Sequence, residues 1–167
     1  HRNEEVREVI GDDYQGILGT DRGKSYDAKE LQDVKQQKCI AHIQRSIDEA
    51  LEGKRGQACG FGLILKSQLK EAVELYQAFH DPSRKLVDYS KRVRALEEEI
   101  SYHLRPRRLK NPDNQRLLNE LGRHHERGNL LRFLHEPTTI EPTNNAAERA
   151  LRPAVIAENR RLQATNP

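Results

Sequence analysis

The spacing of apolar residues changes near residue 60, which divides the chain into two kinds of predicted structure. Before that point, the short apolar run from Tyr14 to Thr20 contains glycines and predicts a buried strand that ends at Asp21. The segment from Val34 to Ile43 predicts a strand running into a helix, which Gly53 stops. A short helix over residues 25–31 would connect the two strands, so we expect a βαβ order and a partly parallel sheet.

After residue 60 the apolar residues recur every three or four positions in two long stripes, which predicts an antiparallel helical hairpin. Asp81-Pro82 ends the first helix, and Pro106 follows the second. Two shorter helices are predicted around Leu117 to Leu121 and Leu130 to Leu134. The stripes are expected to be core, and their members are Leu65, Leu69, Ala72, Val73, Tyr76 and Phe79, then Leu86, Val93, Leu96, Ile100 and Leu104.

The stretch from Glu141 to Pro153 carries the first candidate for chemistry. Helix-capping residues follow Pro142, and Pro153 closes the stretch, so a helix of about two turns fits between the two prolines. Glu148 is the acid in the middle of that helix. Its carboxylate is either a metal ligand of a phosphoryl-transfer site or part of a capping box with Asn145 as the N-cap residue.

Asp21 is the second candidate, and two interpretations of it stay open. Ligands gather at the carboxyl ends of strands in open α/β sheets, which favours a functional acid. The sequence Thr20-Asp21-Arg22-Gly23 is also typical of a turn, which favours a purely local role. The spacing of the residues alone does not decide between the two.

Composition limits the class of protein. At 167 residues the chain can bury one ordinary domain core, and it shows neither a membrane-spanning run nor a signal peptide, so a cytoplasmic protein is expected. Two cysteines give no disulfide framework, and the net charge of +3 permits a polyanionic partner. The chain starts at His1 and has no methionine, so we expect it to be the C-terminal part of a longer protein.

A dense basic cluster occupies the proline-broken segment from Arg105 to Lys110. Its side chains either reach a phosphate backbone or form a solvated loop, and the sequence favours neither interpretation. Cys39 and His42 form a Cys-x-x-His pair without an evident set of further ligands for a structural zinc ion. We expect this pair to pack and hydrogen-bond beneath an active site or in the core.

Taken in chain order, these motifs resemble the DDE transposases of the insertion-sequence-66 family. The matching segments are residues 16–21, 39–45 and 144–156, and the last of them is the most specific. The resemblance implies an α/β, mostly helical fold, with a partial ribonuclease-H-like core and an all-α insertion. The implied divisions are 1–59 for the end of that core, 60–136 for the helical insertion, and 137–167 for the glutamate helix and tail.

The resemblance also implies chemistry and partners. Asp21 and Glu148 would be the second and third acids of a catalytic triad that binds Mg²⁺ or Mn²⁺. Cys39, His42, Asn144 and Asn145 would support this active site. Phosphates of double-stranded DNA would be contacted by Arg149, Arg152, Arg105, Arg107, Arg108 and Lys110. The intact protein would cut transposon ends and join them to target DNA as a homo-oligomer associated with the nucleoid.

The sequence departs from the family pattern at both ends. The first acid would lie on a strand before Tyr14, and the basic run expected after Ile156 is missing. We therefore expect this chain to be inactive by itself. The alternative function is a catalytically inactive remnant that serves as a DNA-binding or protein-interaction helical module. A helical scaffold without any nucleic-acid partner is a further rival.

Overall fold

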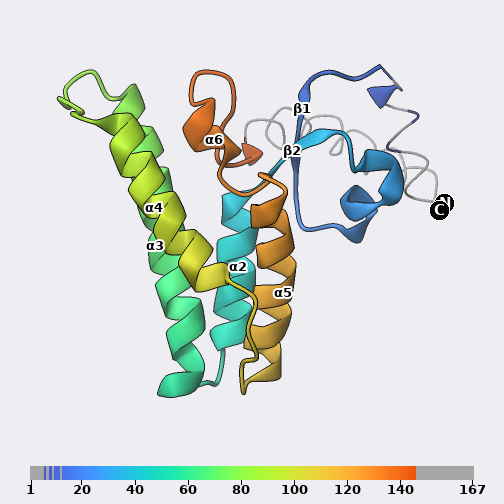
Figure 1. The fold of residues 1–167 in the computed structure, drawn as a ribbon, viewed down its shortest axis with the longest axis vertical. Coiled ribbons are helices and arrows are strands. Elements are labelled where there is room, and N and C mark those ends of the chain that lie inside the picture. Colours follow the sequence, from blue (N-terminus) through green and yellow to red (C-terminus); the bar gives the residue numbers. More distant parts are fainter. Residues whose placement is uncertain (1–5, 7, 9, 12, 146–167) are drawn as a thin grey trace, which may run out of the picture.

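The computed structural model of the protein describes residues 6, 8, 10, 11 and 13–145, and this part is mostly helical. A small parallel sheet lies beside the helices (Figure 1). Its strands, β1 (Ile17–Thr20) and β2 (Lys35–Lys38), are connected through two 3₁₀ turns, η1 (Lys24–Asp27) and η2 (Lys29–Leu31). The helices are α2 (Ile40–Leu51), α3 (Gln57–His80), α4 (Tyr89–Leu104), α5 (Pro112–Glu126) and the single-turn α6 (Arg132–His135).

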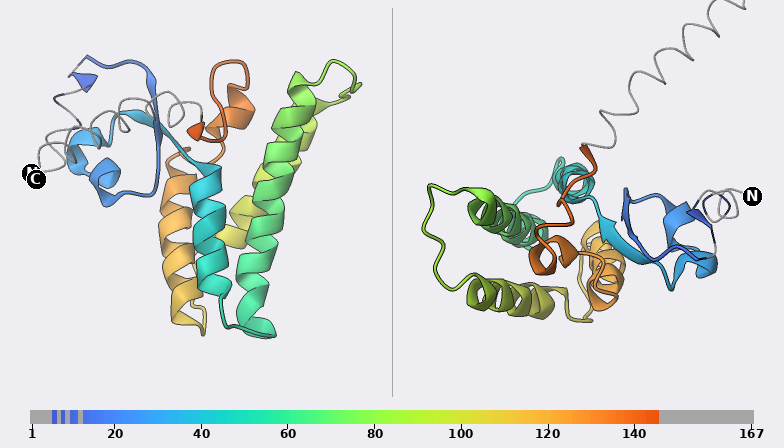
Figure 2. Two further views of the ribbon diagram at one scale, coloured as in Figure 1. Left: turned by 180° about the vertical axis from the view of Figure 1, so that it is seen from behind. Right: turned by 90° about the horizontal axis from the view of Figure 1, so that it is seen from above.

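The helices form one bundle around a shared apolar core. α3 and α4 run side by side in opposite directions, which confirms the predicted hairpin (Figure 1). Seen from above, α2 and α5 lie between this hairpin and the sheet (Figure 2). One cluster of buried apolar side chains takes members from all five helices and from Ile140. This cluster crosses the expected divisions after residues 59 and 136, which stay predictions.

The buried face of α3 departs from the predicted stripe near the end of the helix. It runs through Ala72, Leu75 and Ala78, all of which are buried. Phe79 is 39% exposed and lies against Tyr89, with the ring centroids 4.9 Å apart. The expectation that Phe79 belongs to the core is therefore wrong, because the face that passes through positions 72, 75 and 78 leaves Phe79 at its edge.

The sheet confirms one expectation and corrects another. β1 and β2 pair in parallel, with Thr20 opposite Lys38. β1 is not the buried strand that was expected, because Ile17 and Leu18 are only half-buried and Gly19 is exposed. The reason is that, among the described residues, β2 is the only strand hydrogen-bonded to β1. Among the described residues, β1 is therefore an edge strand with one side unpaired.

The connection between the strands is not the α-helix expected over residues 25–31. Ala28 is extended, with φ −60° and ψ 153°, and separates η1 from η2. Two strands joined in this way do not define a ribonuclease-H-like core, and that part of the fold stays an expectation. None of the described helices has the length and apolar character that crossing a bilayer requires.

Candidate functional site

The carboxyl ends of β1 and β2 meet at one edge of the sheet, as parallel pairing requires. Beyond the last paired residues, the backbone N–H of Cys39 donates to the carbonyl oxygen of Thr20 over 2.7 Å. Asp21 follows Thr20 directly, so it lies next to the hydrogen bond that joins the start of α2 to the end of β1. The predicted position of Asp21 at the end of a strand is confirmed.

Asp21 also closes the local turn that the sequence permits. Its Oδ1 accepts a hydrogen bond from the backbone N–H of Gly23 over 2.7 Å. A Cβ atom at position 23 would lie 2.9 Å from that oxygen, so a larger residue there would push the carboxylate out of its present position. Within the described residues no other donor reaches Asp21. The strand-end and turn interpretations are therefore compatible, because the turn engages Oδ1 and no described residue donates to Oδ2.

Two ion pairs hold the segment after Asp21 in place. Arg22 binds Glu120 of α5 through two hydrogen bonds of 2.8 and 2.5 Å. Lys38, which is completely buried at the end of β2, donates to Asp27 of η1 over 3.0 Å. Because a bidentate arginine pair restrains orientation as well as distance, the backbone next to Asp21 is fixed against α5.

The segment that leads to the asparagine pair docks at the same edge. The backbone N–H of Ile40, the first residue of α2, donates to the carbonyl oxygen of Pro142 over 2.9 Å. Ile140 and Pro142 are buried, so this segment is packed as well as hydrogen-bonded. A hollow of about 550 Å³ lies between it and β1, with Ile17, Gly19, Thr143 and Asn144 among its lining. Asp21 follows the end of β1 and is not among the residues that line this hollow.

Unsatisfied oxygens occur at this edge. Asn144 Oδ1 and Thr20 Oγ1 are buried and accept no hydrogen bond from any described residue. Buried polar atoms in folded proteins nearly always have a partner, so such atoms call for an explanation. Both are hard oxygen atoms of the type that divalent cations bind.

The described residues place some of the predicted site residues together and leave others out. Cys39 is buried at the N-cap position of α2, and His42 is half-buried on the first turn of that helix. Within the described part of the chain, no three His, Cys, Asp or Glu side chains form a metal-binding group. Asn145 is the last described residue, so Glu148, Arg149 and Arg152 lie outside the described residues.

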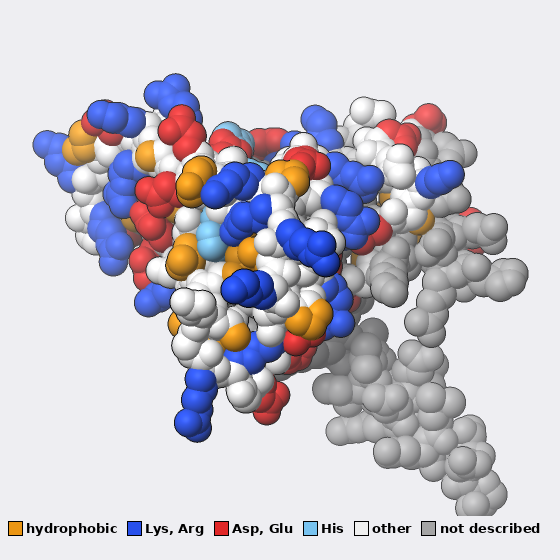
Figure 3. Space-filling view, turned by 60° about the horizontal axis from the view of Figure 1, so that its bottom comes forward, with side chains coloured by type: hydrophobic (Ala, Val, Ile, Leu, Met, Phe, Trp, Pro, Cys, Tyr) orange, Lys and Arg blue, Asp and Glu red, His pale blue; other side chains and the backbone are white. Residues whose placement is uncertain are grey.

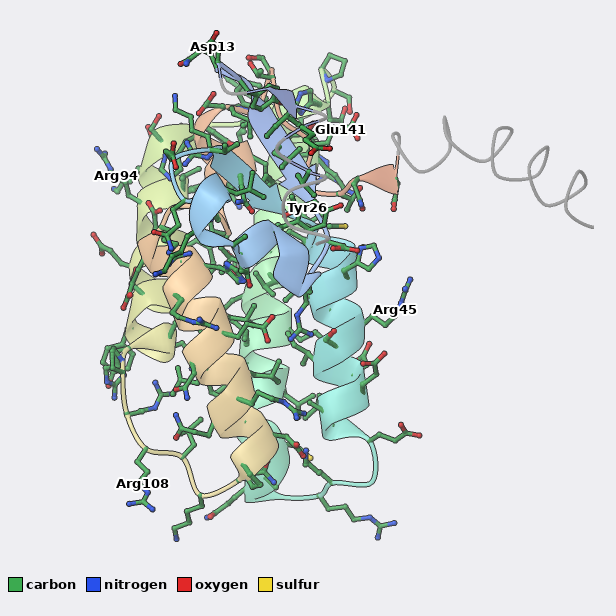
Figure 4. All side chains as sticks on the ribbon, turned by 90° about the vertical axis from the view of Figure 1, so that its right-hand side faces the viewer. Asp13, Tyr26, Arg45, Arg94, Arg108 and Glu141 are labelled. Carbon is green, nitrogen blue, oxygen red and sulfur yellow. The ribbon has the colours of Figure 1, made fainter. Side chains whose placement is uncertain are left out.

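The predicted basic cluster lies at the other end of the molecule. Residues 105–111 connect α4 to α5, and Arg108 lies at the opposite end of the helices from Tyr26 and Glu141 (Figure 4). This separation is not predictable from the sequence, because it depends on how α2 to α5 pack together. The arginines and the lysine of this loop are therefore not side by side with Asp21.

Sequence reasoning missed the buried polar side chains that support the strand ends. Gln36, Gln37 and Lys38 of β2 are all buried, although their strand is polar throughout. Gln37 Nε2 donates to the carbonyl oxygen of Leu130 over 3.0 Å, and its Oε1 accepts from the N–H of Phe133. The polar sequence of β2, directly before the apolar start of α2, could have indicated a buried polar strand. It does not reveal which residues these side chains bind.

His124 on α5 lies in the same buried polar group. This residue is 3% exposed, its Nε2 is 3.8 Å from Asp27 Oδ1, and neither ring nitrogen has a hydrogen-bond partner among the described residues. Burial, followed by the positive charge of Lys38, lowers the pKa of His124 to about 4, although Asp27 and Glu120 act in the opposite direction and Arg123 adds to the lowering. His124 is therefore neutral in the folded protein at neutral pH.

This shift predicts a loss of stability in mild acid. The unfolded chain binds a proton at His124 below about pH 6.5, while the folded chain does so only near pH 4, so the free energy of unfolding falls between these values. We expect protonation of this histidine to lower the free energy of unfolding by about 2 kcal/mol between pH 7 and pH 5. Urea unfolding at the two pH values measures the effect, and His124→Leu should show a smaller pH dependence. Equal dependence in both chains would contradict the assignment to His124.

Comparison with known proteins defines the class of this chain. The family model described as "Transposase IS66 family" matches residues 1–167, the whole length of the chain. The chain therefore belongs to the IS66 family of transposases, which confirms the resemblance drawn from residues 16–21, 39–45 and 144–156. No curated protein and no solved structure matches it. Membership of a transposase family implies a role in transposition and an interaction with DNA.

Proposed function

We propose that this chain contributes Asp21 and Glu148 to the metal-binding acids of a DDE-type transposase that cleaves transposon DNA and joins it to a target. The observation that carries the proposal is the pair of hydrogen bonds from Cys39 to Thr20 and from Ile40 to Pro142. Through them, Asp21 and the segment leading to Glu148 start from the same edge of the sheet. Glu148 follows Asn145 by three residues, a stretch that spans at most about 10 Å.

The donors at this edge suit magnesium by their chemistry. Mg²⁺ prefers carboxylate and other hard oxygen ligands and retains several waters, so a few side chains suffice. The carboxylate of Asp21 and the unpartnered Oδ1 of Asn144 are of this type. When bound, Mg²⁺ or Mn²⁺ would supply Lewis-acid polarisation of the phosphoryl group and activation of the attacking hydroxyl.

The other proposed roles, which are positioning the carboxylate and binding DNA, belong to residues of the chain itself. The turn at Gly23 and the Arg22–Glu120 pair hold the carboxylate of Asp21 at a fixed position, which removes the cost of ordering it during the reaction. Arg149 and Arg152 are proposed to hold phosphates of double-stranded DNA, since the guanidinium fork matches two phosphate oxygens. Cys39 and His42 are proposed to support the strand ends from α2. The homo-oligomeric state of the intact transposase stays part of this proposal.

Substitution of the glutamate tests the proposal. In an active IS66-family transposase that carries this segment, Glu148→Gln removes one charge while keeping size, and strand transfer of labelled transposon ends in Mg²⁺ should be lost while DNA binding persists. Glu98→Gln is the matched control, because Glu98 is an exposed acid on α4 and does not line the hollow at the strand ends. Undiminished strand transfer by Glu148→Gln would overturn the assignment. Salt-sensitive DNA binding without any cleavage by the unmodified protein would instead favour the inactive helical module.

A further inference from the structure

A second hollow lies at the end of the bundle remote from Asp21. It has a volume of about 700 Å³ and lies where the start of α3 meets the end of α4 and the loop that follows. We call it the far-end hollow, and its lining includes Phe61, Tyr102, His103, Arg105, Arg107 and Lys110. Its volume lies within the range of sites that hold small molecules, of roughly 300–1,000 Å³. A nucleotide therefore fits it by size.

The far-end hollow offers flat ring surfaces. Phe61 and His103 are stacked, with ring centroids 4.7 Å apart and planes inclined by 16°. Nε2 of His103 donates to the carbonyl oxygen of Phe61 over 2.9 Å, and burial lowers the pKa of His103, so the ring is neutral at neutral pH. Tyr102 is 68% exposed, the most of any large apolar side chain in the described residues. One face of its ring carries the Arg105 guanidinium at 3.7 Å from the centroid.

Its charge is positive without an opposing acid. Arg105, Arg107 and Lys110 line the hollow, and none of the lining residues is an aspartate or glutamate. Another, more open hollow of about 500 Å³ adjoins the far-end hollow, and its lining includes Arg107, Arg108 and Lys110. Basic side chains gather on this end of the molecule (Figure 3).

The acid in the first turn of α5 is already paired. Asp113 binds Lys54 at 2.7 Å and Arg116 at 3.2 Å, and the hydrogen bond and charge of Lys54 lower the pKa of Asp113. Its charge therefore does not cancel that of the loop. The two adjoining hollows form a continuous basic track along the residues that connect α4 to α5.

We propose that the far-end hollow binds a stretch of single-stranded DNA, with a base stacked on Tyr102 and phosphates on the arginines and lysine of the loop. A duplex presents phosphates and keeps its bases paired, so it would use the charges and leave the exposed ring and the hollow unused. Sequence-tolerant binding of unpaired strands combines a basic track with aromatic rings for stacking, which is the combination present here. The proposal stands independently of the metal site, since none of its residues lies at the strand ends.

Binding of oligonucleotides by the full chain tests the inference. A fluorescently labelled oligo-dT of about 12 nucleotides and a duplex of equal length are titrated, and anisotropy gives both dissociation constants. Tyr102→Ala should weaken single-strand binding roughly tenfold and leave duplex binding nearly unchanged, because only an unpaired base uses the ring. Tyr102→Phe keeps the ring and should restore single-strand binding.

Two further variants distinguish the effect of stacking from the effect of charge and from a general loss of structure. Arg108→Ala should weaken both DNA forms and reduce the salt dependence of each, because it removes a phosphate contact. Phe79→Ala removes a partly exposed ring at the other end of the same helical hairpin and should change neither constant. The inference is overturned if Tyr102→Ala binds the single strand as well as the unmodified chain, or if it weakens duplex binding equally. Loss of strand transfer through Glu148→Gln would leave these results unaffected.

Discussion

Asp21→Asn is expected to leave the fold intact and to reduce strongly the metal-dependent strand transfer of an active IS66-family transposase that carries this segment. The amide oxygen of asparagine can still accept the hydrogen bond from the N–H of Gly23, so the turn after β1 persists. The negative charge and one metal-binding oxygen are lost. We expect a decrease in the rate of strand transfer on the order of 100-fold or more, since residues around a metal already cost 10–100-fold when they act from the outer shell.

Asp81→Asn provides a matched control for this substitution. Asp81 closes an equivalent turn, in which its Oδ1 accepts from the N–H of Ser83 over 2.9 Å, but it lies between α3 and α4. Its substitution should leave strand transfer unchanged. Rates are compared at saturating Mg²⁺ and again with Mn²⁺. If Asp21→Asn kept the unmodified rate with both ions, the turn would be the only role of Asp21.

The helical part of this fold was predictable because helices follow from the spacing of apolar residues that are near one another in the sequence. Apolar spacing located α3, α4 and α5, and Pro82 and Pro106 marked where the first two end. The same spacing misplaced Phe79, because a periodic pattern does not state which side of a helix its neighbours occupy. The 3₁₀ turns were also missed, since an extended residue such as Ala28 carries no special sequence signal.

The candidate site was predictable in its parts and not in its arrangement. The motif around Asn144 indicated the family, which the family model confirms, and the position of Asp21 at a strand end followed from the glycine-bounded run. The placement of the loop around Arg108 depends on how four helices pack, which motif spacing does not encode. Its remote position changes the interpretation of the basic cluster from part of one DNA site to a separate surface.

Asp27→Ala is expected to cost about 3 kcal/mol of the free energy of unfolding. The side chain of Lys38 is completely buried, and its Nζ atom donates a hydrogen bond of 3.0 Å to Asp27. Removing one member of a buried pair leaves an uncompensated charge, which costs about 3–5 kcal/mol. The lower end applies here because the Asp27 side chain is 28% exposed. Urea denaturation followed by circular dichroism measures the change.

Two comparisons show whether the loss comes from the buried charge. Asp48→Ala breaks the exposed ion pair with Lys66 and should cost less than about 1 kcal/mol. The double variant Asp27→Ala/Lys38→Met removes both charges and should recover most of the stability, because no ion is then left in the core. If Asp27→Ala and Asp48→Ala cost the same, Lys38 does not depend on Asp27. Lys38 lies opposite Thr20 in β1, so the buried pair lies beside the backbone that precedes Asp21.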